Sequence, residues 1–242
     1  MEDDIYDRHV VRIVLSSAIF VLCDINTFGH GIRPPEREEL PRYTALAYGS
    51  SITHGAGSAA GPLCYVSHAA ALLNTQIMNK GLGGSCFMEK CVSDWFCSIP
   101  FDYMVFEAGT NMYDDYENTV IEDRGKYMLL KILSSHPDSY VFMLEPPMIF
   151  RQKQNSDKYK AFSESIYKIY DFAKSDKCIF LSNDKIQLKG SYVSCDLIHP
   201  TPLGHVMMGT NLAGLIEPYL MGKEEVWKKI SGASHRHQRL EV

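Results

Sequence analysis

Short apolar runs alternate with longer segments of helical periodicity from residue 43 onward. Five runs are short, apolar and followed by turn residues, which is typical of buried strands. We expect strands at residues 44–48, 76–79, 103–108, 140–145 and 178–181. Between them, apolar residues spaced three and four apart predict helices that each bury one face. The expected helices span residues 63–73, 90–96, 121–135, 158–173 and 203–220.

This alternation predicts an α/β fold, in which helices cover both faces of a central five-stranded parallel sheet as a three-layer α/β/α sandwich. Two Val- and Ile-rich runs precede it, at residues 9–15 and 18–25, and they predict a short N-terminal β-hairpin. We therefore divide the chain into an N-terminal extension and linker (1–40), one α/β domain (41–222) and a C-terminal tail (223–242).

Composition and charge narrow the possible partners. The formal net charge is -5, and basic stripes interleaved with aromatic residues are absent from the sequence, so we expect no nucleic-acid partner. Seven cysteines without a CxxC pair predict neither a complete disulfide framework nor a zinc site. The apolar run from Ile13 to Cys23 follows acidic residues and is too short to span a bilayer. We expect a cytoplasmic protein without a membrane partner, and the sequence gives no sign of its oligomeric state.

Polar or glycine-rich segments follow four of the predicted strands. In an open parallel sheet, ligands bind outside the carboxyl ends of the strands, so these segments are expected to meet there. They are Gly49-Ser50-Ser51-Ile52-Thr53, Asn79-Lys80-Gly81-Leu82-Gly83-Gly84-Ser85, Gly109-Thr110-Asn111 and Asp196-Leu197-Ile198-His199-Pro200.

The residue types in these segments match the requirements of acyl transfer. A serine hydroxyl is a weak nucleophile at neutral pH, so it needs a base within reach and donors aimed at the developing oxyanion. Ser51 is the candidate nucleophile and His199 the candidate base, and Asp196 is placed to fix the imidazole tautomer. Gly84 and Asn111 are the candidate oxyanion donors. This chemistry requires no metal and no cofactor.

Taken in order, the four segments resemble the conserved blocks of the SGNH hydrolases, the GDSL-like lipases and acylhydrolases. The resemblance runs from residue 43 to about residue 220 and implies the flavodoxin-like fold of that family. It also implies that Ser51 is both the nucleophile and the first backbone oxyanion donor, with Gly84 as the second. Asn111 is then the side-chain donor, and Asp196 and His199 complete the triad.

The first block resembles the branch with Gly-x-Ser-Ile-Thr, whose relatives include carbohydrate esterases and other short-chain esterases. That resemblance implies short acyl esters, acetyl above all, as substrates, on a small molecule or an acylated sugar. Ser50 stands where the family usually has Asp. This difference leaves the triad intact but removes the side chain that usually stabilises the turn. Residues 1–40 resemble only the end of the β-sandwich that often precedes this domain.

Two alternatives remain. The run from Gly55 to Ala60 superficially fits a glycine-rich nucleotide fingerprint, but Ser51-Ile52-Thr53 separates it from the strand, and Asn79-Lys80 ends the next strand where an acid is expected. A catalytically inactive binding module with the same fold is the second alternative, since fold does not guarantee function. The complete set of Ser, Gly, Asn, Asp and His favours the hydrolase.

Overall fold

A computed structural model describes residues 9–13, 21–147, 149–186 and 189–221. Five strands form one parallel sheet in the order β2-β1-β3-β4-β5. They are β1 (Tyr43–Tyr48), β2 (Thr75–Asn79), β3 (Tyr103–Glu107), β4 (Tyr140–Leu144) and β5 (Cys178–Leu181). All five predicted strands are confirmed, and their ends differ from the predicted ones by at most one residue.

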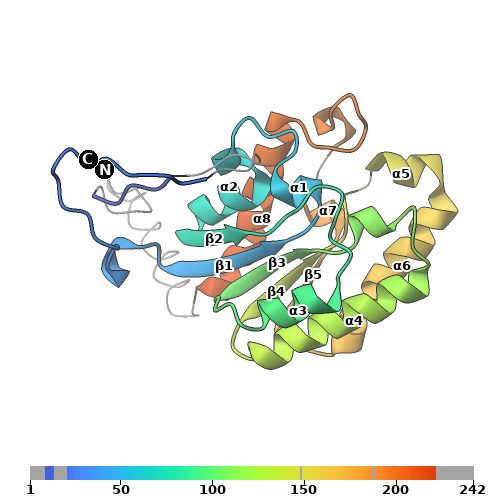
Figure 1. Cartoon of the computed structure of the whole chain (residues 1–242). Coiled ribbons are helices and arrows are strands. Elements are labelled where there is room, and N and C mark those ends of the chain that lie inside the picture. Colours follow the sequence, from blue (N-terminus) through green and yellow to red (C-terminus); the bar gives the residue numbers. More distant parts are fainter. Residues whose placement is uncertain (1–8, 14–20, 148, 187–188, 222–242) are drawn as a thin grey trace, which may run out of the picture.

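Helices cover both faces of this sheet (Figure 1), so the three-layer α/β/α architecture is confirmed. On one face lie α2 (Tyr65–Leu72) and α8 (Pro202–Leu220). On the other face lie α3 (Lys90–Phe96), α4 (Asn118–Ser135) and α6 (Ser156–Ala173). These are the five predicted helices. Three shorter helices are α1 (Ser51–His54), α5 (Ile149–Gln154) and α7 (Asn183–Ile186).

The side chains of β1 show how the sequence divides the core between the two faces. Ala45 and Ala47 pack with α2 and α8, whereas Leu46 and Tyr48 pack with the helices of the other face. All four are buried. A parallel strand covered on both faces is apolar along its whole length, as this one is. Burying a large side chain such as Phe106 in this core contributes about 1.5–3 kcal/mol.

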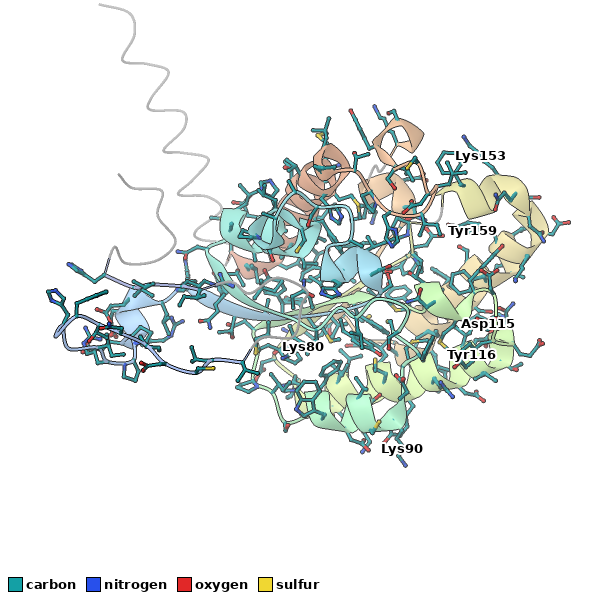
Figure 2. All side chains as sticks on the ribbon, turned by 45° about the horizontal axis from the view of Figure 1, so that its top comes forward. Lys80, Lys90, Asp115, Tyr116, Lys153 and Tyr159 are labelled. Carbon is teal, nitrogen blue, oxygen red and sulfur yellow. The ribbon has the colours of Figure 1, made fainter. Side chains whose placement is uncertain are left out.

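Charged side chains lie on the outward faces of the helices. Lys90 on α3 and Lys153 on α5 are exposed and point away from the sheet (Figure 2). Within the described ranges, no helix combines the length and the apolar character needed to cross a membrane.

The predicted N-terminal hairpin is wrong for the residues that can be described. Residues 9–13 and 21–25 contain no strand, and residues 14–20 lie outside the described ranges. A lone two-stranded hairpin is marginally stable unless one face packs on other structure. Val11, Ile13 and Val21 are between 71% and 85% exposed, so this packing is missing. The boundary near residue 40 stays a prediction, and the predicted tail lies outside the described residues.

Candidate active site

The candidate nucleophile stands on a tight turn directly after β1. Ser51 is the first residue of α1, and the hydroxyl of the preceding Ser50 accepts a hydrogen bond from the N–H of Ile52 at 3.2 Å. A serine at the N-cap satisfies one of the donors that a helix start leaves free. Ser50 therefore stabilises the turn in place of the usual Asp. Gly55 ends the helix with φ 111°, a conformation that suits glycine.

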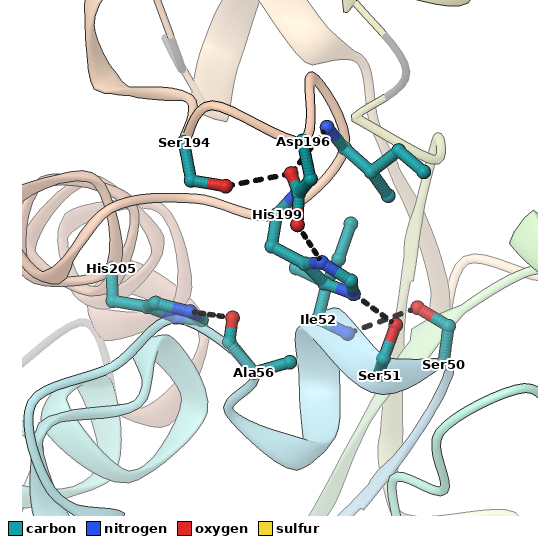
Figure 3. A network of polar contacts seen from close by, with 9 residues as sticks. Ser50, Ser51, Ile52, Ala56, Ser194, Asp196, His199 and His205 are labelled. Carbon is teal, nitrogen blue, oxygen red and sulfur yellow. Dashed lines mark hydrogen bonds and ion pairs between the residues drawn. The ribbon is translucent and has the colours of Figure 1, made fainter.

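Among the three predicted triad residues, His199 lies within hydrogen-bond reach of both Ser51 and Asp196 (Figure 3). The Oγ atom of Ser51 is 2.8 Å from Nε2 of His199. On the other side of the ring, Nδ1 of His199 is 2.6 Å from Oδ2 of Asp196. With the ring proton on Nδ1 donated to the carboxylate, Nε2 is free to accept the serine proton. The side chain of His199 is 25% exposed, so a substrate can reach this pair.

Asp196 is held by more than the histidine. Its Oδ1 atom accepts hydrogen bonds from the hydroxyl of Ser194 at 2.6 Å and from the N–H groups of Ile198 and His199 at 2.9 and 3.0 Å. The Ser194 hydroxyl first, and then His199, hold the pKa of this carboxyl far below its usual range. Asp196 is therefore ionised at neutral pH and opposes the charge of an imidazolium. Ser194 was not among the predicted site residues, although a hydroxyl two residues before an acid on a turn is a recognisable pattern.

The histidine loop packs closely on the segment after α1. A Cβ atom added at Gly57 would lie 2.1 Å from the carbonyl oxygen of Pro200, so only glycine allows this approach. The glycine-rich run from Gly55 to Ala60 thus follows a helix and packs against the residue after His199. Its glycines have a structural explanation that needs no nucleotide.

The segment that holds the candidate oxyanion donor Gly84 runs beside Ser51. A Cβ atom added at Gly83 would be 3.7 Å from Cβ of Ser51. Gly84 has φ 67°, and no atom lies within 4 Å of the position a Cβ would take there. The N–H groups of Ser51 and Gly84 donate to no residue that the structure describes. Both donors are therefore available to a substrate oxygen.

Asn111 lies in the turn Thr110–Met112 after β3. Its Nδ2 atom donates a hydrogen bond to the carbonyl oxygen of Ser85, which links this turn to the Gly84 segment. A carboxamide has two N–H donors, so one remains for a ligand. All the predicted site residues thus lie on turns at the carboxyl edge of the sheet, around Ser51.

A buried histidine supports this arrangement from behind. The ring of His205 on α8 is fully buried, with Nε2 2.9 Å from the carbonyl oxygen of Ala56 and Nδ1 3.3 Å from the nitrogen of Tyr65. Because the amide N–H of Tyr65 donates to Nδ1, the neutral ring carries its proton on Nε2 and donates it to Ala56. His205 therefore ties α8 to both ends of the loop that joins α1 and α2, and Figure 3 shows the contact with Ala56 at the first end.

Burial lowers the pKa of His205 below its ordinary value of 6.5. The unfolded chain therefore takes up a proton at higher pH than the native protein does. We expect the free energy of unfolding to be largest above this ordinary pKa and to fall as the pH drops toward the native pKa. Urea unfolding at about pH 7.5 and about pH 5 measures the loss. A His205→Gln variant should lose less between the two values, and an equal loss in both proteins would contradict this role.

The family model of the GDSL-like Lipase/Acylhydrolase family matches residues 44–217, which is more than half of the chain. The chain therefore belongs to the GDSL-like lipase/acylhydrolase family, as the resemblance of its four segments predicted. Membership of this family supports hydrolase activity. No curated protein gave a significant match.

Solved structures with the same fold include esterases. A putative GDSL-like lipase from Bacteroides ovatus has a TM-score of 0.64 and 20% identity, over 74% of this chain and 54% of that one. A carbohydrate esterase family 2 enzyme with a carbohydrate binding domain, from Corynascus thermopiles, has a TM-score of 0.67 and 20% identity, over 82% and 71%. A family two carbohydrate esterase from Cellvibrio japonicus has a TM-score of 0.59 and 17% identity, over 74% and 62%. The chain thus spans about half of the first of these proteins.

Proposed function

We propose that this protein is a serine ester hydrolase that works through an acyl-serine intermediate. The observation that carries the proposal is the continuous contact from Asp196 through His199 to Ser51, at 2.6 and 2.8 Å, beside unused backbone donors. A nucleophile, its base and an orienting acid in this geometry are the parts that acyl transfer needs.

In the first half of the reaction, Ser51 attacks the ester carbonyl while His199 takes up the hydroxyl proton. Asp196 stabilises the imidazolium that forms. The N–H groups of Ser51 and Gly84 and the carboxamide of Asn111 donate to the oxyanion of the tetrahedral intermediate. His199 then gives its proton to the departing alcohol. In the second half, water attacks the acyl-enzyme with His199 again as the base, which releases the acid and restores Ser51.

For the substrate, we propose short acyl esters, acetyl above all, carried by a small alcohol or a sugar. The carbohydrate esterases among the structural neighbours support the sugar. The half-exposed side chain of Asp196 and the partly exposed His199 support a shallow site that accepts the ester group of a larger carrier.

A chain-length series of p-nitrophenyl esters, assayed beside acetylated sugars, tests this function. The wild-type rate should exceed that of a Ser51→Ala blank and should be highest for acetyl among the p-nitrophenyl esters. Rates that equal the blank for every ester and every sugar would favour the inactive binding module. A maximum at long acyl chains would contradict the proposed substrate class.

The Asn111→Ala variant should lower kcat by about 10²–10³-fold, the usual cost of removing one oxyanion donor. KM should change little, because the charge that Asn111 stabilises develops only in the transition state. Steady-state kinetics with p-nitrophenyl acetate measures both constants. Asn118→Ala, at the start of α4, is the matched control and should behave as wild type. An unchanged kcat in the Asn111 variant would remove this residue from the site.

A further inference from the structure

Glu107 is a buried acid that the proposed mechanism does not use. It is the last residue of β3, between the nucleophile turn and the Asn111 turn, and is only 1% exposed. No basic side chain forms an ion pair with it in the ranges that the structure describes. An acid buried without a cation is costly unless hydrogen bonds compensate for the lost water.

Four donors surround the carboxylate of Glu107. Its Oε1 atom accepts hydrogen bonds from the hydroxyl of Ser50, at 2.6 Å, and from the hydroxyl of Thr110. Its Oε2 atom accepts from the N–H of Ser50 at 3.2 Å and from the hydroxyl of Thr53 at 2.5 Å. A carboxylate offers about four acceptor positions, so these four donors fill it.

The partners of Glu107 are the chain neighbours of the proposed catalytic groups. Ser50 precedes Ser51 and Thr110 precedes Asn111, so a single carboxylate oxygen joins the turn of the nucleophile to the turn of the side-chain oxyanion donor. The backbone of Glu107 reaches the third segment, because its carbonyl oxygen accepts from the thiol of Cys86 at 3.2 Å. Glu107 thus contacts all three segments that hold Ser51, Gly84 and Asn111.

Two further features preserve this contact. A Cβ atom added at Gly49 would lie 2.7 Å from Oε2 of Glu107 and 2.2 Å from the hydroxyl of Thr53, so glycine is needed for the carboxylate to reach the turn. The hydroxyl of Thr53 also lies 2.8 Å from that of the fully buried Tyr65 on α2. The carboxylate is therefore part of a packed network that fixes its position.

We propose that Glu107 is a positioning residue that sets the separation between Ser51 and the oxyanion donor Asn111. The inference rests on the proposed esterase function. Glu107 is buried and its carboxylate is filled by hydrogen bonds within the protein, so it acts through Ser50 and Thr110. Misplacing a reacting group by about 1 Å can lower the rate about 10²-fold. Loss of the hydrogen bonds by which Glu107 links the two turns should therefore lower kcat.

Replacing Glu107 by glutamine keeps the size of the side chain but replaces one carboxylate oxygen by an NH₂ group. That group is a donor, and it would face the hydroxyl or N–H donors that now bind the oxygen. We expect E107Q to lower kcat for p-nitrophenyl acetate by about tenfold or more and to change KM by less than about twofold. The thermal midpoint of each variant is recorded, and rates are measured well below it so that only folded protein is compared.

A double-mutant cycle with Asn111→Ala separates positioning from a general loss of structure. The cycle compares the fold-loss in kcat that E107Q causes in wild type with the fold-loss that it causes in the Asn111→Ala protein. If Glu107 acts by placing Asn111, the second fold-loss should be smaller than the first by about threefold or more. Two fold-losses that agree within about threefold would overturn the proposal. Absence of wild-type activity above the Ser51→Ala blank would overturn the esterase function itself, so the two failures are distinguishable.

Glu145 provides a control, because it is a partly buried acid that also follows a strand and accepts several hydrogen bonds. This residue follows β4 and accepts hydrogen bonds from the hydroxyl of Ser163, at 2.5 Å, and from the N–H of Asn183, at 3.0 Å. The hydroxyl of Tyr159, on α6 (Figure 2), lies 3.4 Å away. None of these partners belongs to the turns that hold Ser51, Gly84 or Asn111, so Glu145→Gln should change the thermal midpoint but not kcat. A fall in kcat as large as that of E107Q would overturn the specific role of Glu107.

If E107Q fails to fold, a second pair of variants tests the hydrogen bond between Thr110 and Glu107. Thr110→Val keeps the shape of the side chain and removes its hydrogen bond to Glu107, whereas Thr110→Ser keeps the hydroxyl. We expect a lower kcat in Thr110→Val with KM nearly unchanged, and near wild-type kcat in Thr110→Ser. Equal kcat values in the two variants would overturn the proposal.

Discussion

Replacement of Ser51 by alanine should lower kcat for p-nitrophenyl acetate by about a millionfold, the scale measured when the nucleophile of a serine hydrolase is removed. The proposed reaction passes through an ester bond to the Ser51 oxygen, and alanine cannot form it. The backbone donors at residues 51 and 84 remain, so a small residual rate above uncatalysed hydrolysis is expected.

Chemical labelling provides a second measurement for the same variant. An alkyl fluorophosphonate should add one phosphonyl group to wild-type protein, seen as a mass increase, and should leave Ser51→Ala unmodified. Ser58→Ala is the control, because this nearby hydroxyl donates to the carbonyl oxygen of Gly55 and contacts no proposed catalytic group. It should be labelled as wild type is. Labelling of Ser51→Ala at wild-type speed would mean that another residue is the nucleophile.

Replacement of Asp196 by asparagine should lower kcat by about 10⁴-fold. The carboxylate accepts the Nδ1 proton of His199, and this leaves Nε2 free to accept the proton of Ser51. An amide nitrogen facing Nδ1 favours the other tautomer, in which Nε2 carries the proton and cannot act as a base. The loop itself should persist, because asparagine keeps an oxygen that can accept from Ser194 and from the N–H of Ile198.

The pH profile makes this prediction specific. The pKa of Asp196 lies far below its usual range, so its carboxylate stays ionised across any practical assay pH. The fall in rate caused by Asp196→Asn should therefore appear throughout the neutral and alkaline range. Ser194→Ala, which removes one donor to the same carboxylate, should have a much smaller effect. A rate for Asp196→Asn within about tenfold of wild type would mean that another group orients His199.

The sequence was sufficient to predict the sheet and the meeting of the four polar segments. Buried strands such as β3 are continuous apolar runs with turn residues at their ends, and the carboxyl ends of parallel strands share one edge. Ser51, Asn111 and His199 follow different strands, so their meeting follows from the topology. The short helices α1, α5 and α7 were missed because four to six residues are too few to show a helical period.

Other features depend on packing that a linear pattern does not contain. Residues 9–13 have the composition of a strand, but strand formation also requires a partner and a covered face, and Val11 is 85% exposed. Glu107 is an acid at the end of the otherwise apolar strand β3, and the linear pattern does not show which groups compensate its burial. Thr53 and Thr110 lie 54 residues upstream and 3 residues downstream of it, and only the folded chain shows that both donate to one carboxylate.

The strand order also determines when the proposed site is complete. The turns that hold Ser51, Gly84 and Asn111 follow three neighbouring strands, β1, β2 and β3. The histidine loop comes after β5 at the far edge, and the chain must return across the sheet to bring His199 to Ser51. During synthesis, the segments that hold the proposed nucleophile and oxyanion donors therefore emerge well before the segment that holds the proposed base. The proposed ester hydrolysis requires synthesis to have passed His199, so we expect a nascent chain that lacks this residue to be inactive.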